Sequence, residues 1–327
     1  MFNLFKSQHC PILGVDISST AVRILELSID GVGHAVRVYA IAPLPIQTID
    51  GHTIQQIEVV ASTIKKLLTT APFFSTQAAC AIPDALAISK TIQINAGLCH
   101  QAIEALVMAE AARFIPYPLS DVYLDFTVLG PWSQNNAKHE VLIVASRSGH
   151  VQERVDVLTL AGLEPVLVDV ESDVVERTVS RMVSQLPRGS EKKTIVILEI
   201  EDESTHLFLL QEMRVISARE AAFDGGQLTA SFYDSVLLNL RSGLQFFSVT
   251  SLSSIDYILL AGRHARRAGL SHQLQQHLNI PIAIANPLGH MNHSSQVDSH
   301  KIIDDAPLLM RALGLALRSG GASYESY

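Results

Sequence analysis

Two turns in the sequence carry polar side chains that could contact a phosphate or a metal ion. The first follows the apolar residues 12–16 and contains Ser18, Ser19 and Thr20, with Asp16 at its start. Hydroxyl and backbone N–H groups in such a turn can donate hydrogen bonds to an anion. The same residues also suit an ordinary polar turn between two strands, so both interpretations stay open.

The second turn follows the apolar residues 194–200 and is acidic. Four carboxylates stand within five positions: Glu199, Glu201, Asp202 and Glu203. Negative charges at close range repel a phosphate, so this turn is unfavourable for phosphate binding. A metal site is conceivable here, but an exposed acidic turn is the interpretation that we favour.

Two further sets of side chains could do chemistry, and each has a simpler explanation. Asp169 and Glu171 stand at a predicted strand end and could include a catalytic base, but they also precede a predicted helix, whose N-terminus favours negative charge. Two pairs of histidines could ligate a metal: His290 with His293, and His264 with His272. The segment around the first pair has no apolar periodicity and is typical of a solvated loop. We therefore predict no catalytic residue and no metal site.

The composition indicates a folded protein with more than one domain. The chain has 327 residues, of which 48% are hydrophobic and 17% are charged. A chain of this length typically forms about two domains, and this much apolar material excludes a disordered protein. The formal net charge of -8 argues against a nucleic-acid-binding protein, which would carry a basic surface.

The cysteines and the lengths of the apolar stretches indicate the cellular compartment of the protein. Cys10, Cys80 and Cys99 are few and lack any close spacing, which fits a reducing compartment and argues against zinc. The apolar runs are shorter than the roughly 20 residues that span a bilayer. Residues 1–6 do not resemble a secretory signal. We expect a cytoplasmic protein that reaches a membrane only through a partner.

The order of predicted elements is repeated in the two halves of the chain. In the first half, three strands, a helix that opens at Thr53 and a buried strand follow one another: 12–16, 22–27, 35–42, 53–68 and 78–82. In the second half the same kinds of element recur at 194–200, 206–210, 214–219, 228–247 and 257–261. This order predicts an internal duplication into two α/β lobes that face each other across a cleft, the actin-like (ribonuclease H-like) architecture.

A different pattern of strands and helices separates the two halves and predicts a small α/β insertion at 87–169. The expected organisation is a first lobe at 1–86 and 170–190, the insertion, and a second lobe at 191–327. Residues 187–193 are the best candidate for a boundary between domains, since Pro187 and Gly189 end the preceding helix.

Several motifs resemble the type IV pilus assembly PilM family. They occur in order between residues 14 and 318: 14–27, 39–45, 110–119, 125–126, 161–171, 219–229, 244–247, 286–287 and 305–318. The resemblance implies an actin-like fold similar to that of the cell-division protein FtsA. In that fold 87–169 is the inserted subdomain 1C, while the rest of the first lobe is subdomain 1A and the second lobe is subdomain 2A.

The resemblance also implies a function without catalysis. Family members bind the cytoplasmic N-terminal tail of PilN, a single-pass inner-membrane protein, in a groove between subdomains 1A and 1C. They thereby form a scaffold at the cytoplasmic face of the inner membrane, which links PilN, PilO and PilP to the pilus motor ATPases and can be a homo-oligomer. The groove residues expected here, whose alternative role is packing between the subdomains, are Pro43, Leu44, Phe114, Tyr117 and Leu119.

ATP with Mg²⁺ is the cofactor that the resemblance implies. The family positions for nucleotide binding are Asp16, Ser18, Ser19, Thr20, Arg23, Gly225, Gly226 and Gly262. Three departures damage this site: Glu201 replaces a glycine of the second phosphate turn, Arg263 follows Gly262 where the family has a second glycine, and the subdomain called 2B is reduced to one helix.

We therefore predict weak or absent ATP binding and no turnover. The alternative is an actin-like ATPase or a nucleotide-dependent filament former, against which the missing subdomain argues.

Overall fold

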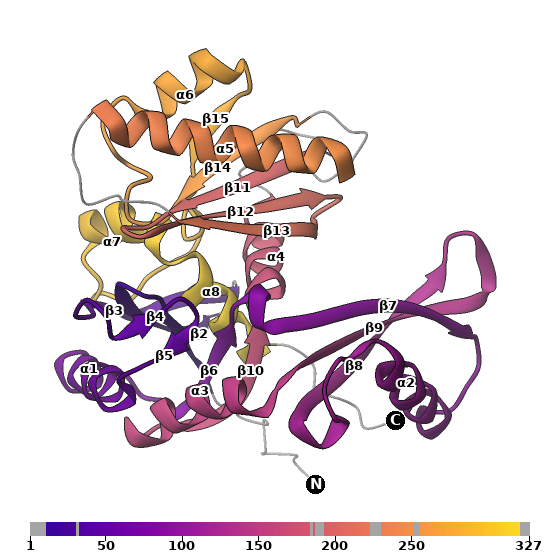
Figure 1. Cartoon of the computed structure of the whole chain (residues 1–327). Coiled ribbons are helices and arrows are strands. Elements are labelled where there is room, and N and C mark those ends of the chain that lie inside the picture. The colour runs from indigo at the N-terminus through magenta and orange to yellow at the C-terminus, as the bar shows by residue number, and fades with distance from the viewer. Residues whose placement is uncertain are drawn as a thin grey trace, which may run out of the picture.

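The computed structural model describes residues 11–30, 33–183, 186, 193–222, 230–250 and 255–320. Two layered lobes are stacked one above the other, and a third, smaller unit projects from the side (Figure 1). Gly225 and Gly226 lie outside the described residues.

The first lobe is built on a five-stranded sheet of order β10-β6-β1-β2-β3. Its strands are β1 (Leu13–Ile17), β2 (Ala21–Asp30), β3 (Gly33–Pro43), β6 (Gln77–Ile82) and β10 (Glu164–Val170). β1 to β3 form the predicted antiparallel meander, and β6 runs parallel to both β1 and β10. Helices α1 (Ile57–Thr70) and α3 (Ser148–Leu160) cover one face, and the small β4 (Ile49–Asp50) and β5 (Thr53–Ile54) pair beside them.

The second lobe repeats this plan, with a sheet of order β13-β12-β11-β14-β15. Its strands are β11 (Thr194–Ile200), β12 (Ser204–Gln211), β13 (Arg214–Ala222), β14 (Tyr257–Ala261) and β15 (Ile282–Ile284). Helices α5 (Ala230–Thr250) and α6 (Leu270–Leu278) pack on the outer face. The pairings match those of the first lobe strand for strand, which confirms the predicted actin-like fold. α5 alone is the helix described between β13 and β14.

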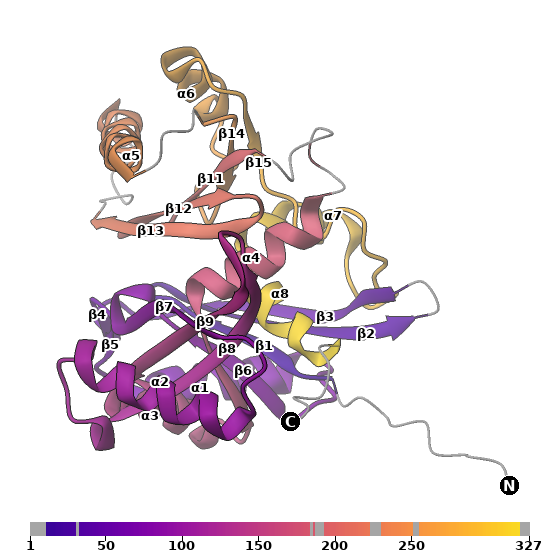
Figure 2. The same ribbon diagram turned by 90° about the vertical axis from the view of Figure 1, so that its right-hand side faces the viewer.

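Two helices lie between the sheets of the lobes: α4 (Glu171–Met182) and α8 (Met310–Ala316) (Figure 2). α4 packs against the second sheet through Val175, Val179 and Met182, while α8 packs against β2. Before α8 come α7 (Ser299–Asp305) and the 3₁₀ turn η5 (Ala306–Leu308), and after it η6 (Leu317–Gly320). These two helices are therefore the layer through which the lobes contact each other.

α8 approaches its neighbours closely because small residues stand at the crossings. A Cβ on Gly314 would lie 2.2 Å from the carbonyl oxygen of Val174, and a Cβ on Gly14 would lie 1.9 Å from that of Ala312. At these two positions only glycine allows the backbones to come this close. The position of α8, and of every side chain that it carries, is thus fixed against both α4 and β1.

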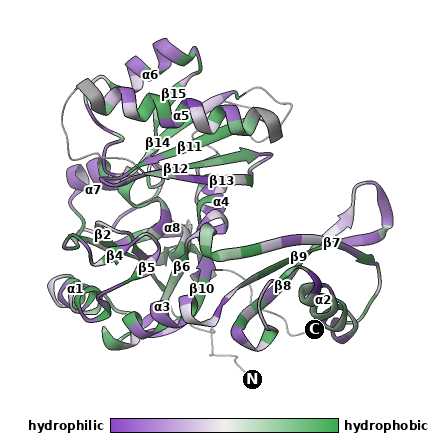
Figure 3. Cartoon of the chain, in the orientation of Figure 1, coloured by the Kyte–Doolittle hydropathy of each residue, from purple (hydrophilic) through white to green (hydrophobic). Residues whose placement is uncertain are grey.

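The third unit is a three-stranded sheet of order β7-β9-β8. Its elements are β7 (Ala87–Asn95), α2 (His100–Phe114), β8 (Val122–Trp132) and β9 (Asn135–Arg147), with the 3₁₀ turns η1 (Asp84–Leu86) before β7 and η2 (Leu119–Asp121) between α2 and β8. α2 covers one face of this sheet. Figure 3 shows hydrophobic colouring along the strands of the lobes and hydrophilic colouring at the tip of the hairpin between β8 and β9.

Two expected boundaries differ from the structure. The insertion was expected to end at residue 169, but β10 pairs with β6 and α3 packs on the first lobe, so the separate sheet ends at Arg147. The second lobe was expected to extend to residue 327, but α8 returns to the first sheet. The pattern of a single strand or helix does not show which sheet it joins, because that depends on contacts that are distant in sequence.

None of the described helices is long and apolar enough to cross a membrane.

Candidate functional site

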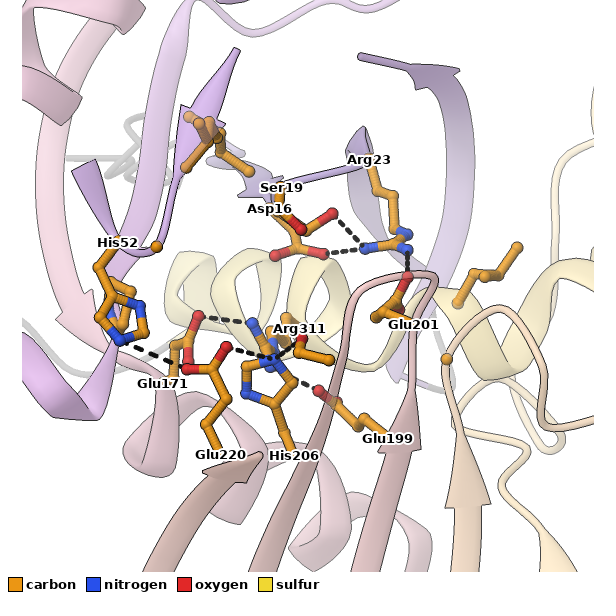
Figure 4. A pocket seen from close by; sticks show the side chains of 18 of the residues that line it. Asp16, Ser19, Arg23, His52, Glu171, Glu199, Glu201, His206, Glu220 and Arg311 are labelled. Atoms are coloured by element: carbon orange, nitrogen blue, oxygen red, sulfur yellow. Dashed lines mark hydrogen bonds and ion pairs between the residues drawn. The ribbon is translucent and has the colours of Figure 1, made fainter. Parts of the chain in front are cut away.

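The two polar turns from the sequence face each other across the cleft between the lobes (Figure 4). Asp16 and the turn after β1 come from the first lobe, and Glu199 and Glu201 come from the end of β11 in the second. The cavity between them has a volume of about 50 Å³. This volume holds a few water molecules, since one water needs at least ~10–15 Å³ of such space.

Arg23 on β2 occupies one side of the cleft. Its Nη1 donates to Asp16 Oδ2 at 3.0 Å and its Nη2 donates to Glu201 Oε2 at 2.7 Å, so one guanidinium joins a carboxylate from each lobe. Arg23 is only 3% exposed and Glu201 only 7%. Burial lowers the pKa of Arg23, but Glu201 and Asp16 more than offset this, and the net pKa is raised. The guanidinium therefore keeps its charge inside the protein.

Arg311 on α8 makes the equivalent contact on the other side. Its Nη1 donates to Glu171 Oε1, at the start of α4, and its Nη2 donates to Glu199 Oε2 at 2.6 Å. Burial lowers the pKa of Arg311, but Glu171 and Glu199 outweigh it and the net pKa lies well above the ordinary value. Burial raises the pKa of Glu171, and Asp84 and Glu199 add to the rise, whereas the charge of Arg311 opposes it.

The exposed acidic turn that we expected from the sequence is only half correct, since Glu203 is exposed but two of the four carboxylates are not. Glu199 and Glu201 are buried, because Arg311 and Arg23 compensate their charges. Asp202 is partly exposed and pairs with Arg263 and His264. Burial of a carboxylate is acceptable when an arginine satisfies it, and the sequence alone did not reveal these partners.

A histidine pair also bridges the lobes. His52 from the β4–β5 turn lies 3.4 Å from Glu220 on β13, and His206 on β12 lies 3.6 Å from the same carboxylate. Ser204 Oγ is 2.8 Å from His206 Nε2. Ser204 and Glu220 approach the same ring nitrogen, whereas a serine nucleophile needs its acid on the opposite nitrogen. This geometry is unsuited to nucleophilic catalysis.

The structure places the predicted nucleotide residues unevenly. Asp16, Ser18, Ser19, Arg23 and Gly262 line the cavity. Thr20 belongs to the same turn, but its buried hydroxyl has no hydrogen-bond partner among the residues that the structure describes. The carboxylate of Asp16, which would face a metal ion, is held by Arg23 instead.

The loop after β14 is filled by protein side chains. Gly262 has φ +80°, and a Cβ there would lie 2.8 Å from the backbone nitrogen of Ile200, so this glycine lets the loop pack on β11. The His264 ring packs against Phe232 at 5.2 Å, and the Arg267 guanidinium lies 3.7 Å from the centre of the same ring. Large side chains thus stand where the family resemblance implies an adenosine-binding loop.

The remaining candidates from the sequence have structural partners. Asp169 pairs with Arg177 at 2.9 Å and with Arg318 at 3.3 Å, while Glu171 binds Arg311 rather than capping α4 with its side chain. Among the described residues, no group of three or more His, Cys, Asp or Glu is placed to hold a metal ion. Arg311 was not among the residues expected from the sequence, although a charged residue inside an apolar final helix is a signal that could have identified it.

A groove lies between the insertion and the two lobes, with a volume of about 260 Å³. One wall is the face of the β7–β9 sheet opposite α2, with Ser89, Leu142 and Val144, and the other is β13, with residues 215–218. The start of α4 and Asp84 close its inner end. A second cavity of about 190 Å³, lined by Asp84, Glu171 and Glu220, connects this region with the cleft.

The five expected groove residues lie elsewhere and not together. Leu44 is buried in the core of the first lobe, next to α1, and Pro43 ends β3. Phe114 and Leu119 pack on the insertion sheet, and Tyr117 is 40% exposed with Arg147 over its ring at 5.1 Å. Packing, the alternative role, is what the structure shows for Leu44, Phe114 and Leu119. Peptide contact by the five stays a prediction.

Two sheets of identical strand order, with α4 and α8 between them, define an actin-like protein. The ethanolamine utilization protein EutJ from Carboxydothermus hydrogenoformans shares this fold, with a TM-score of 0.53 and 12% identity over 94% of this chain and 89% of that one. The PilM-PilN type IV pilus biogenesis complex contains a more similar chain, with a TM-score of 0.78 and 25% identity over 96% of this chain and 100% of that one. The model of the family described as type IV pilus assembly protein PilM matches residues 14–240 and 230–320. The chain belongs to this family.

The groove contains a carboxyl group with an unusual pKa. Burial raises the pKa of Asp173, in the first turn of α4, from 3.8 to about 6, and Asp169, Glu176 and Asp84 add to the rise while Arg177 opposes it. The protonated form therefore stabilises the folded chain. This contribution is fully present below the ordinary pKa and is lost as the pH rises through about 6.

We expect Asp173→Asn to leave the free energy of unfolding unchanged near pH 4 and to raise it by about 1 kcal/mol near pH 8. This is less than the full pKa shift of Asp173 implies, because solvent screens the carboxylate. Urea unfolding at both pH values measures the difference. The exposed Asp125→Asn is the control, with the same small effect at both. An Asp173→Asn effect that does not change with pH would contradict the prediction.

Proposed function

We propose that this chain is a scaffold of the type IV pilus assembly platform that binds the cytoplasmic N-terminal tail of a PilN protein and does so without nucleotide turnover. The observation that carries the proposal is the match along nearly the whole chain to the PilM-PilN complex, at a TM-score of 0.78. Binding PilN would place the chain at the cytoplasmic face of the inner membrane. Through PilN it would connect to PilO, PilP and the pilus motor ATPases.

The groove between the insertion and the lobes is the site that suits an extended tail. It contains apolar side chains, Leu142, Val144 and the 48% exposed Ile216, which a peptide can cover. Both β7 and β13 stand at the edge of their sheets. Edge strands offer backbone hydrogen-bonding groups to an extended peptide, a common mode of peptide recognition. The inner end at Asp84, Val170 and Ser172 belongs to the junction of the first lobe and the insertion.

The interlobe cleft supports the proposal that nucleotide is not required. The carboxylates of Asp16, Glu199 and Glu201 are engaged by arginines. The cavity between these side chains has a volume of about 50 Å³, room for a few water molecules. Weak or absent binding of Mg-ATP and no hydrolysis are what this arrangement favours.

Titration of a fluorescent peptide with the sequence of the cognate PilN tail tests the proposal. We expect binding with a Kd of about 10 μM or tighter, unchanged by Mg-ATP, and none for a scrambled peptide. Failure to bind at about ten times that concentration would overturn the scaffold assignment. ATP hydrolysis, or pelleting in the centrifuge that depends on ATP, would favour the ATPase or filament alternative.

A further inference from the structure

Two arginines of the first lobe bind carboxylates at the end of β11, a strand of the second lobe. Arg23 is on β2 and Arg311 is on α8, which packs on β2, so both are rooted in the first lobe. Their partners in the second lobe are Glu201 and Glu199, two residues apart at the end of β11. We call these four residues, with Asp16 and Glu171, the clasp.

The clasp fixes the orientation of the two lobes relative to each other, in addition to joining them. Each arginine gives Nη1 to a carboxylate on its own side, Asp16 or Glu171, and Nη2 to a carboxylate of the second lobe. A guanidinium is planar and rigid, so its two nitrogens hold the two carboxylates at a fixed separation. All six side chains are buried, and moving the lobes apart would leave buried charges without partners.

The groove depends on the same placement of the lobes. Glu171 is followed directly by Ser172 and Asp173, which line the inner end of the groove on the side of the first lobe. On the other side, β11 pairs with β12 and β12 pairs with β13, whose residues 215–218 form the opposite wall. The clasp therefore holds the start of α4, which lines one wall of the groove, and β11, which is connected through β12 to the wall formed by β13.

From this geometry we infer that the clasp locks the two lobes at one spacing and so keeps the groove preformed, with Arg311 as a positioning residue that does not touch the peptide. The effect on peptide binding rests on the proposed function, whereas the effect on lobe spacing does not. A preformed groove binds more tightly because less ordering is needed on binding.

The lobe spacing is measurable directly. Spin labels are attached at Lys66→Cys on α1 and Leu238→Cys on α5, which are exposed positions on the outer helices of the two lobes. Double electron–electron resonance then measures the distance between the labels. The background carries Cys10→Ser and Cys99→Ser, so that these cysteines are not labelled. We expect one narrow distance distribution for this parent and a longer or broader one for Arg311→Met and Arg23→Met. Arg311→Lys, which keeps the charge without the fork, should lie between them.

Arg154→Met is the matched control. Arg154 is buried and lines the same cavity, but its hydrogen bonds go to the carbonyl oxygen of His52 and to Glu153, both in the first lobe. It should leave the distance distribution and the peptide affinity unchanged. Since Arg311→Met can unfold the chain, the combination Arg311→Met, Glu171→Gln and Glu199→Gln, which removes the charges together, is measured beside it.

The peptide arm uses the fluorescent cognate PilN tail. We expect Arg311→Met and the combined variant to weaken its binding about tenfold, equivalent to about 1.4 kcal/mol, with partial recovery in Arg311→Lys. Unchanged lobe distances in the clasp variants would overturn the lock, and changed distances with unchanged affinity would overturn its link to the groove. If the parent does not bind the tail, the proposed function fails, while the distances still decide whether the lock exists.

Discussion

Gly314→Ala is expected to destabilise the chain by about 3 kcal/mol, the upper end of the range for overpacked sites. The added Cβ would lie 2.2 Å from the carbonyl oxygen of Val174 and 2.6 Å from Thr178 Oγ1. Thr178 Oγ1 itself donates a hydrogen bond to the carbonyl oxygen of Met310 at 2.8 Å, so it cannot move away without losing this bond between α4 and α8. Urea or thermal unfolding of the purified protein measures the loss.

The same substitution at Gly149 is the control for this prediction. Gly149 is in α3, and a Cβ there would meet no atom of the described residues within 4 Å. Gly149→Ala should be neutral or stabilising by up to about 1 kcal/mol, because alanine has less conformational freedom to lose in a helix. Equal effects of the two variants would show that the crossing of α4 and α8 is not as close as described.

Val144→Trp is expected to weaken binding of the PilN tail about a hundredfold while leaving the fold intact. Val144 lies on the groove side of β9, opposite Ser89 on β7, and an indole there would occupy the groove itself. Aromatic side chains are well accepted in strands, so the fold should be preserved. Peptide anisotropy gives the affinity and circular dichroism checks the fold.

Thr127→Trp is the matched control for the groove. Thr127 is exposed on the same face of the insertion sheet but does not line the groove. Its replacement should leave the affinity unchanged. If Thr127→Trp weakened binding as much as Val144→Trp, the tail would have to bind over the whole face of the sheet rather than in the groove.

The strands of the two lobes were predictable from sequence because their signals are local. The apolar run at 194–200 coincides with β11, and the run at 12–16 is displaced by one residue from β1; each is followed by a polar turn. The predicted helix start at Thr53 was wrong. Thr53 pairs with Asp50 in the β4–β5 hairpin, and α1 begins at Ile57. The spacing of Thr53 and Gln56 suggested a helix cap, but in the structure Thr53 forms a strand pair with Asp50 instead.

The contacts that define the site could not be predicted from local pattern. Glu201 binds an arginine 178 positions away in the sequence, and Glu199 binds one 112 positions away. Without these partners four carboxylates in one turn indicate an exposed segment, which is why we expected the wrong environment for them. The groove was missed for a related reason, because its walls come from β9, α4 and β13, and no single motif contains more than one of them.

The path of the chain determines when the clasp can form during synthesis. β1, β2 and β11 are all made before α8, which carries Arg311 and packs back on the first lobe. Until α8 emerges from the ribosome, Glu171 and Glu199 lack their common partner, and the first sheet lacks the helix that packs against β1 and β2. The two lobes can therefore each begin to fold in order of synthesis, but the Arg311 part of the clasp can form only after both sheets are complete.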